Sequence, residues 1–197
     1  MRVTLSDIAI VKAGHPFRGK IPVHKKGNAY VVQVRDINDD GFIHWDQLIR
    51  TTITGRKSPD WLQQGDVLFA ARGQRNVAAC IDIVRSPTVC APHYFLVNIR
   101  DTSLILPEFL SWQLNQETAR RYFSQSAEGS AQISIRRAVL ENAPLVIPDI
   151  KEQRAIVALD NKAKQEKRVL NALIENRTKQ MQAIAQRLLT GTQTVIE

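Results

Sequence analysis

The chain has 197 residues, of which 44% are apolar and 23% charged, and its formal net charge is +8. This length suits one ordinary domain with a smaller appendage, and the composition excludes global disorder, a collagen-like repeat and low complexity. Apolar runs stay far below the roughly 20 residues that span a bilayer, and the opening segment lacks a secretory pattern. We therefore expect a cytoplasmic protein, and the basic excess favours a polyanion as its partner.

Residues 1–148 predict a mixed domain of short strands and helices. A short helix is expected over 5–11, and a longer one from Pro107, which suits a first helical turn, to residue 123. Segments with β-branched and aromatic residues, separated by Gly, Pro, Asn and Asp, predict strands at 30–34, 41–45, 66–71, 77–84, 94–99 and 144–148. Strands mixed with helices, without a regular βαβ alternation, indicate an α+β fold.

Residues 149–191 predict one long helix, with a short tail at 192–197. Asp149 suits the N-cap, Glu152 has the spacing of a capping box, and Gly191 suits the left-handed residue that ends a helix. At 1.5 Å per residue such a helix is roughly 60 Å long, longer than a small domain is wide.

A narrow apolar stripe follows this helix at steps of three and four residues. Lys167 and Arg177 interrupt it, and its register shifts between Leu170 and Ile174. One interpretation is a helix that lies along its own domain. The length favours a second helix from another copy as the cover, and hence a homodimer. The expected interface residues are Ile156, Leu159, Ala163, Leu170, Ile174, Met181, Ile184 and Leu188.

The sequence lacks the usual motifs of several enzyme classes. It contains no Gly-x-Gly and no Gly-Lys-Ser/Thr, so a dinucleotide fingerprint and a P-loop are excluded. It contains no Pro-Pro pair, which excludes the Pro-Pro-aromatic motif with which amino-methyltransferases hold a target base. We expect no catalysis by this chain alone and no catalytic residues. A nuclease is the alternative, with the Asp149-Ile150-Lys151 spacing and Asp60 or Asp66 as a metal ligand, but that spacing coincides with a helix cap.

The two cysteines are too few for a disulfide framework. Cys80, Cys90 and His93 lack the short spacing of a structural zinc site and have no fourth ligand close by in the sequence. We expect no metal site, and we interpret the cysteines as buried thiols in adjacent strands.

Guanidinium and amide groups gather in three loops. The loop at 71–76 lies between two apolar strands. Its arginines can donate hydrogen bonds to the O6 and N7 of guanine, and its asparagine or glutamine can bond to the N6 and N7 of adenine. The loop at 129–134 offers hydroxyls and backbone amides to phosphates, and a glutamine to a base. The loop at 14–27 is basic. A solvated hairpin turn is the alternative for the loop at 71–76, and a flexible charged loop is the alternative for the loop at 14–27. The candidate DNA-binding residues are Arg18, Lys20, Arg72, Gln74, Arg75, Asn76, Ser130, Gln132 and Arg136.

The order of these pieces resembles the specificity subunits of Type I restriction-modification systems over nearly the whole chain. The resemblance rests on LSDIAIVKAG, GDVLFAARGQRNVA, LNQETARRYFSQSAEGSAQ and ISIRRAVLENAPLVIPDIKEQRAIVALD in that order, and on a closing QRLLTG. The junction of the GSAQ loop, the PLVIP strand and the EQRAIV helix start is its most specific part. Such subunits carry two target-recognition domains and two long helices that pair antiparallel. This sequence has one of each, which implies a half-subunit.

The resemblance implies a homodimer in which the two long helices form an antiparallel coiled coil. Its two recognition domains, residues 1–148 of each copy, would read a bipartite inverted-repeat site in double-stranded DNA. The implied partners are modification subunits, which carry S-adenosylmethionine and methylate adenine, and a restriction or motor subunit; this chain would hold no cofactor. Candidate contacts for these partners are Arg154, Lys162, Lys164 and Lys179. The alternative is a regulatory or anti-restriction protein that binds modification subunits without selective DNA recognition.

Overall fold

A computed structural model describes residues 1–54, 58–73, 76–84, 86–126 and 133–191 of the chain. They belong to two compact units: a globular unit, Met1–Val157, and a helical unit that begins at Ala158. The predicted tail at 192–197 lies outside the described residues. None of the described helices is both long and apolar enough to cross a membrane.

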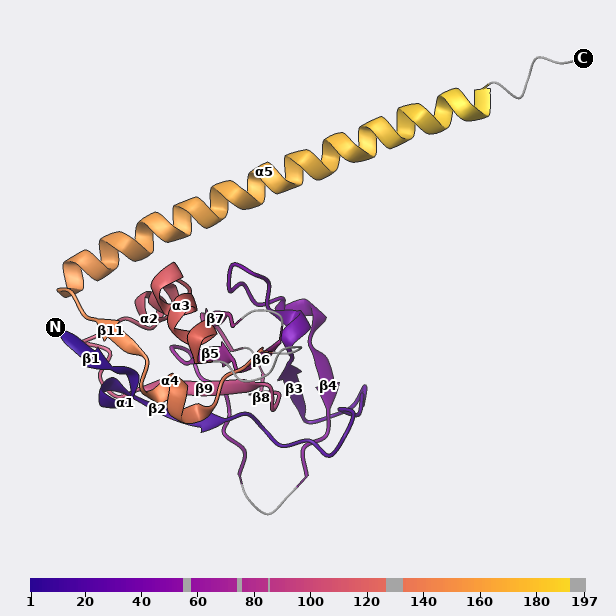
Figure 1. The fold of residues 1–197 in the computed structure, drawn as a ribbon. Coiled ribbons are helices and arrows are strands. Elements are labelled where there is room, and N and C mark those ends of the chain that lie inside the picture. Colours follow the sequence, from indigo (N-terminus) through magenta and orange to yellow (C-terminus); the bar gives the residue numbers. More distant parts are fainter. Residues whose placement is uncertain (55–57, 74–75, 85, 127–132, 192–197) are drawn as a thin grey trace, which may run out of the picture. The chain divides into compact units, whose positions relative to one another are not determined.

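A four-stranded antiparallel sheet forms the centre of the globular unit (Figure 1). Its order is β2 (Ala9–Ala13), β9 (Tyr94–Ile99), β5 (Val67–Ala70) and β7 (Ala78–Cys80). Strand β5 is buried on both faces, because Val67 and Phe69 belong to one apolar cluster while Leu68 and Ala70 belong to another. This double burial explains its continuous apolar sequence.

A second sheet and two strand pairs complete the β structure. The second sheet has the order β4 (Ile49–Thr51), β3 (Ala29–Val32) and β8 (Thr88–Cys90), and the β3–β8 pair is parallel. The strand pairs are β1 (Arg2–Thr4) with β11 (Pro144–Val146), and β6 (Arg72–Gly73) with β10 (Ile133–Ser134). The structure is therefore α+β, as predicted.

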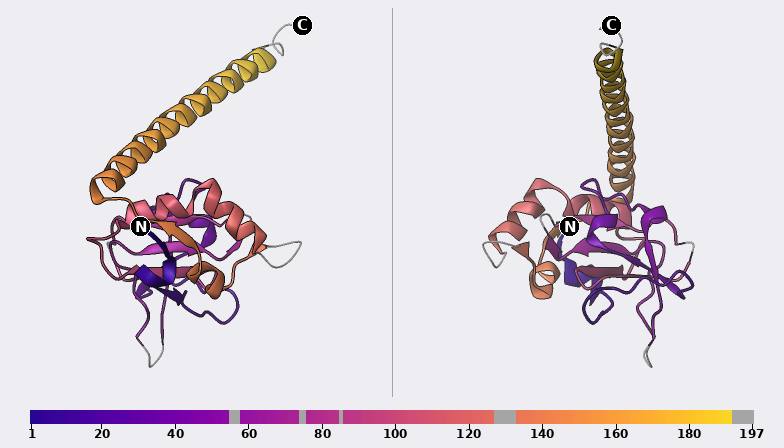
Figure 2. Two further views of the ribbon diagram at one scale, coloured as in Figure 1. Left: turned by 60° about the vertical axis from the view of Figure 1, so that its left-hand side comes forward. Right: turned by 90° about the vertical axis from the view of Figure 1, so that its right-hand side faces the viewer.

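Five α-helices and two 3-10 turns are described. The helices are α1 (Leu5–Ile8), α2 (Pro107–Leu114), α3 (Glu117–Gln125), α4 (Arg137–Glu141) and α5 (Ile150–Gly191), and the turns are η1 (Val34–Asp36) and η2 (Trp45–Gln47). Figure 2 shows α2 and α3 on one side of the central strands. Their Phe109 and Phe123 pack with Phe69 of β5 in the first apolar cluster. The second cluster joins the two sheets through Leu68 and Val32.

The first turns of α5 are anchored in the globular unit. Asp149 caps the helix, because its Oδ1 accepts a hydrogen bond of 2.9 Å from the Glu152 amide. Gln153 is completely buried, and Ile156 and Val157 pack against the first apolar cluster. The predicted long helix is confirmed; the coiled-coil dimer stays a prediction.

The expected helix over 5–11 was too long. Thr4 and Asp7 form a capping box, with Asp7 Oδ2 accepting hydrogen bonds from both the Thr4 amide and hydroxyl. The helix nevertheless ends at Ile8, because the following residues, which include the β-branched Ile10 and Val11, alternate between exposed and buried along β2 and pair with β9. Pairing with a long neighbouring strand outweighs local helix propensity here.

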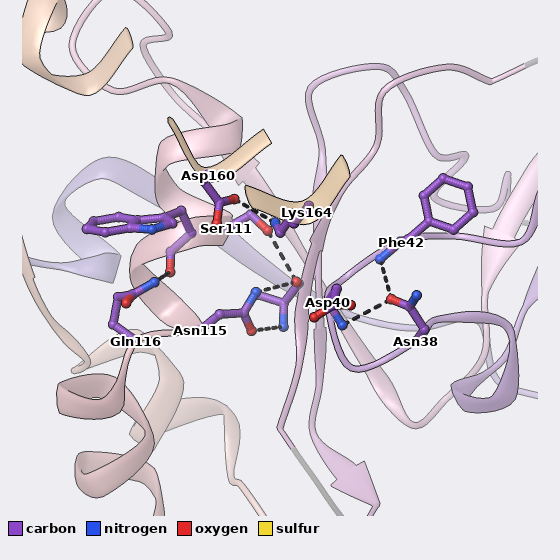
Figure 3. Close-up of polar contacts among 10 residues, drawn as sticks. Asn38, Asp40, Phe42, Ser111, Asn115, Gln116, Asp160 and Lys164 are labelled. Carbon is purple, nitrogen blue, oxygen red and sulfur yellow. Dashed lines mark hydrogen bonds and ion pairs between the residues drawn. The ribbon is translucent and has the colours of Figure 1, made fainter. Parts of the chain in front are cut away.

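Two further predictions of single elements were wrong. The expected helix from Pro107 to 123 is broken into α2 and α3 at Asn115 and Gln116. The segment 41–45 is not a strand: the Asn38 Oδ1 accepts hydrogen bonds from the Asp40 and Phe42 amides (Figure 3), Ile43 forms an isolated bridge with Ile37, and η2 begins at Trp45. An asparagine side chain that satisfies backbone amides competes with strand pairing.

Asn115 protects the outer edge of strand β7. Its Oδ1 accepts a hydrogen bond of 2.9 Å from the Ala78 amide, and its Nδ2 donates one of 2.8 Å to the Ala78 carbonyl (Figure 3). Ser111 of α2 donates to the same carbonyl at 3.2 Å. The Asn115 side chain thereby satisfies backbone groups of β7 that a neighbouring strand would otherwise bond. This role accompanies the break between α2 and α3 at Asn115 and Gln116.

Candidate nucleic-acid interface

The strand pair β6–β10 joins two loops that lie about 60 residues apart in the sequence. Arg72 lies opposite Ser134, and Gly73 lies opposite Ile133. The Ile135 amide extends the pairing with a 2.8 Å hydrogen bond to the Ala71 carbonyl. We predicted the loops at 71–76 and 129–134 separately as DNA-binding. The start of the first loop is therefore paired with the end of the second.

The rigid base of the 71–76 loop comes from buried strand residues. Ala70 is buried, and its amide donates to the Val77 carbonyl at 2.9 Å. Gly73 has a φ of 145°, a backbone conformation that side chains rarely allow. The Asn76 Nδ2 donates a 2.8 Å hydrogen bond to the Ala70 carbonyl. This amide group closes the turn, whereas the Arg72 side chain is exposed.

The first residues of the 14–27 loop are bonded close to the base of the 71–76 loop. A turn at 91–94 lies between them, since the Ala71 amide donates to the His93 carbonyl at 2.8 Å. The Gly14 amide donates to the Tyr94 carbonyl, and the His15 amide donates to the Cys90 carbonyl. A Cβ atom at Gly14 would collide with the Ala91 carbonyl oxygen, so only glycine allows this close approach.

These three segments contain the whole of the protein's excess charge. Residues 14–27, 71–76 and 129–137 hold eight lysines and arginines and no aspartate or glutamate. The other 168 residues hold nineteen basic and nineteen acidic side chains, and are formally neutral. The strand pairing and the 91–94 turn bring together the bases of these segments: Arg72 and Ser134 in the β6–β10 pair, and Gly14 and His15 beside the turn. An excess of positive charge attracts phosphate groups.

The structure shows part of the predicted DNA-binding set. Arg18, Lys20, Arg72 and Arg136 are exposed, and Arg136 is the N-cap of α4. Its neighbour Arg137 forms an ion pair with Glu141 at 2.7 Å. Gln74, Arg75, Ser130 and Gln132 lie outside the described residues. The contacts of all these side chains with DNA stay predictions.

Sequence reasoning considered His93 only as a metal ligand and missed the turn that contains it. His93 is exposed, and its carbonyl holds the base of the 71–76 loop. The available signal was the Ala-Pro-His break between the apolar segments at 88–90 and 94–99, which is typical of a tight turn.

The carboxylates of the nuclease alternative have structural partners. Asp60 forms an ion pair of 2.7 Å with Lys12. Asp66 is buried, accepts a 2.6 Å hydrogen bond from the Asn98 Nδ2 and a 2.7 Å bond from the Gln63 amide, and its pKa is raised by desolvation. Asp149 caps α5. Within the described parts of the chain, no three His, Cys, Asp or Glu side chains form a group that could hold a metal ion.

The cysteines do not lie in adjacent strands as we expected. Cys80 is in β7 of the central sheet, whereas Cys90 is in β8 of the second sheet. Cys90 is buried, and desolvation raises the pKa of its thiol to about 12. Burial explains this thiol as a packing group.

The described part of α5 beyond Ala158 exposes large apolar side chains. The exposed fraction is 70% for Leu159 and 65% for Met181. Other exposed members of the predicted interface are Ala163, Leu170, Ile174, Ile184 and Leu188, and Val169, Leu173 and Leu189 are exposed as well. Ile156 differs, because it packs against its own globular unit. It is not available in full to a second helix.

The cations that we predicted to face other subunits are of two kinds. Arg154 and Lys162 are exposed. Lys164 and Lys179 form ion pairs of 2.7 Å with Asp160 and Glu175, each four residues earlier on the helix (Figure 3 shows the first). The hydrogen bond from Lys179 lowers the pKa of Glu175. Such pairs stabilise an exposed helix by a few tenths of a kcal/mol.

No family model and no curated protein matches this sequence. Solved structures match it at low identity. The S subunit of the Type I restriction-modification system from M. genitalium has a TM-score of 0.61 and 15% identity, covering 98% of this chain and 46% of that chain. The HsdS subunit from Thermoanaerobacter tengcongensis has a TM-score of 0.63 and 17% identity, covering 100% of this chain and 50% of that chain.

A third match comes from a structural study of complex assembly and conformational transition in the type I R-M system. Its TM-score is 0.69 at 17% identity, and it covers 100% of this chain and 50% of that chain. The chain thus spans about half the length of the subunits that it matches. It has the fold of half of a Type I S subunit, which agrees with the resemblance seen in the sequence.

Proposed function

We propose that this chain is the DNA-reading half of a Type I specificity subunit. The globular unit binds one half of a split site in double-stranded DNA through the loops at 14–27, 71–76 and 129–137. The observation that carries this proposal is that the entire +8 charge belongs to segments whose bases β6–β10 pairing and the 91–94 turn bring together. The fold of an S subunit supports the same function.

Within the surface, the side chains divide into two roles. Arg18, Lys20 and Arg136 contact phosphates, which position a protein on DNA without reading its sequence. The exposed Arg72 lies on a turn held by buried strands, and its guanidinium contacts a guanine edge. Asn76 contributes indirectly, since its amide nitrogen is bonded to the Ala70 carbonyl.

The chain works as a homodimer through α5. The exposed apolar stripe from Leu159 to Leu188 requires a cover, and a second copy supplies a matching one. A twofold dimer presents two identical reading surfaces, so its site consists of two inverted half-sites with unread base pairs between them. The chain itself is not an enzyme: modification subunits, which carry S-adenosylmethionine, supply the methyl transfer, and a restriction subunit joins where one is present.

Duplex binding at several salt concentrations tests the DNA surface. Replacing Arg18, Lys20 and Arg136 by alanine should weaken binding to all duplexes and reduce the salt dependence by about one ion per phosphate contact. Each replacement is made as a single variant, and Lys179→Ala, which removes the same one charge from α5, is the matched control for each. Equal losses in the control would show that the three loops are not the binding surface.

Sequence reading requires a separate measurement. Duplexes bound from a random pool should share a split motif, and Arg72→Ala should relax it at one base pair per half-site, at a cost of roughly 1–3 kcal/mol. A uniform loss on every sequence would make Arg72 a phosphate contact. A chain that binds modification subunits but enriches no sequence would be a regulatory protein instead.

A further inference from the structure

A hollow of about 510 Å³ lies in the globular unit, and none of the described residues that line it belongs to the three basic loops. Tyr30, Phe42 and Trp45 supply aromatic walls, and Asp46 and Ser86 supply polar groups. Small-molecule sites in proteins have volumes of about 300–1,000 Å³, a mostly apolar lining and a few polar groups. The hollow has this size and this kind of lining, and the DNA surface proposed above does not use it.

The aromatic walls are held in place by the surrounding structure. Trp45 packs against the second apolar cluster, and its Nε1 donates a 3.3 Å hydrogen bond to the Asp82 carboxylate. Phe42 follows a turn that is fixed by hydrogen bonds from backbone amides to the Asn38 Oδ1 (Figure 3). Tyr30 lies in β3, the central strand of the second sheet. The shape of the hollow therefore does not depend on a ligand.

Three polar groups of the hollow are available to a ligand. Within the described parts of the chain, the Asp46 carboxylate and the hydroxyls of Tyr30 and Ser86 form no hydrogen bond. A carboxylate has two oxygens side by side, and both only accept hydrogen bonds. Guanine presents two adjacent donors, its N1–H and its 2-amino group, whereas adenine and cytosine present a donor beside an acceptor. An aromatic hollow with a carboxylate therefore suits guanine best.

A guanidinium group lies at the Tyr30 wall of the hollow. Arg50 lies opposite Tyr30 in the β3–β4 pair, and its Cζ is 5.6 Å from the centre of the Tyr30 ring. The Arg50 side chain is exposed and forms no ion pair with a carboxylate of the described residues. The basic loop at 14–27 passes beside it, since the His24 amide donates to the Arg50 carbonyl at 2.8 Å. This positive charge repels a cationic ligand and attracts a phosphate group.

We propose that this hollow binds a guanine nucleotide. The base stacks on the rings of Phe42 and Trp45, and its N1–H and 2-amino group donate to the Asp46 carboxylate. The phosphate contacts the Arg50 guanidinium. A free nucleotide and an unpaired guanosine of a DNA strand present the same base and phosphate, so both are ligands of this chemistry. The proposal rests on residues outside the DNA surface and does not depend on the proposed function.

Calorimetric titration of the full chain with guanosine 5′-monophosphate tests the site. We expect a dissociation constant below about 1 mM, and about tenfold weaker binding of adenosine and cytidine 5′-monophosphates. Asp46→Asn should remove this preference, because an amide presents a donor beside an acceptor. Glu108→Gln, which neutralises an exposed carboxylate on α2, is the matched control and should keep the preference. No binding of guanosine 5′-monophosphate, or an unchanged preference in Asp46→Asn, would overturn the proposal.

The phosphate contact has a test of its own. Arg50→Ala should weaken the binding of guanosine 5′-monophosphate about tenfold and leave the binding of guanosine, which has no phosphate, unchanged. Arg154→Ala, which removes the same charge from an exposed position on α5, is the matched control. Equal losses for nucleotide and nucleoside in Arg50→Ala would overturn this contact. Binding of tetramethylammonium without binding of any nucleotide would overturn the proposal in favour of a cation site.

Two DNA duplexes identify the source of the nucleotide. They differ only in one unpaired guanosine, and tighter binding of the bulged duplex that is lost in Asp46→Asn would support an unpaired DNA base as the ligand. Equal binding of both duplexes, together with binding of guanosine 5′-monophosphate, would support a free nucleotide. Duplex binding without nucleotide binding would overturn this inference alone, whereas nucleotide binding without duplex binding would overturn the proposed DNA-reading function alone.

Discussion

Gln153 fixes the first turns of α5 in the globular unit. Its side chain is completely buried, its Oε1 accepts a hydrogen bond of 2.9 Å from the Leu106 amide, and its Nε2 donates to the carbonyls of Leu104 at 2.9 Å and Pro148 at 3.0 Å. Gln153→Leu keeps the approximate volume but removes all three bonds and leaves a buried amide without its acceptor. At about 1 kcal/mol for each bond, the globular unit should lose roughly 3 kcal/mol.

Tryptophan fluorescence during urea unfolding measures this loss selectively. All three tryptophans, Trp45, Trp61 and Trp112, lie in the globular unit, so the signal does not include the unfolding of the rest of α5. For a unit of this size the melting temperature should fall by roughly 10 °C. Arg154→Ala, the exposed neighbour on the same helical turn, should change stability by less than about 0.5 kcal/mol. Equal unfolding midpoints for Gln153→Leu and this control would refute the reasoning.

Two further predictions concern the globular unit. Asn115→Ala removes both hydrogen bonds to Ala78 and should cost about 2 kcal/mol, with faster amide hydrogen exchange at Ala78; unchanged exchange there would contradict the edge-protection role. Burial raises the pKa of Asp66 above its ordinary value of 3.8, so the folded form holds its proton more tightly than the unfolded chain, and stability from this group falls as the pH rises above 3.8. Asp66→Asn should therefore make the decline in unfolding free energy above pH 3.8 less steep. Part of the decline should remain, because burial also raises the pKa of Asp36. An unchanged pH profile would argue against this effect of Asp66.

The sequence correctly predicted elements that are stabilised by their own residues or that carry a long pattern of apolar residues. Helix α5 has a capping aspartate and more than forty residues without proline, and strand β9 begins with four aromatic or aliphatic residues in succession, Tyr94 to Val97. Elements that depend on distant partners could not be found. Ala9–Ala13 became a strand because β9 pairs with it, and the interruption at Asn115 depends on the edge of β7, more than thirty residues away.

The candidate site shows the same division. The composition of the three basic loops was readable in the sequence, and so was the apolar support of the 71–76 loop. The sequence could not predict that the bases of these loops lie close together. Their proximity depends on a two-residue strand pair and on the carbonyls of the 91–94 turn, and neither has a side-chain signature. The role of Asn76 was also hidden, because an amide in a turn can bond to a base or to its own backbone equally well.

The pairing of β1 with β11 has a consequence for how the protein is made. Arg2 lies opposite Val146, and the Met1 ammonium group donates to the Ile147 carbonyl at 2.9 Å. During synthesis the first strand has no partner until nearly the whole globular unit has left the ribosome, and closing so long a segment is slow. The base of α5 follows β11 directly, so the nascent helix gains its foundation only at that last step. In a newly made chain the closure of the globular unit and the anchoring of α5 thus depend on the same strand pair.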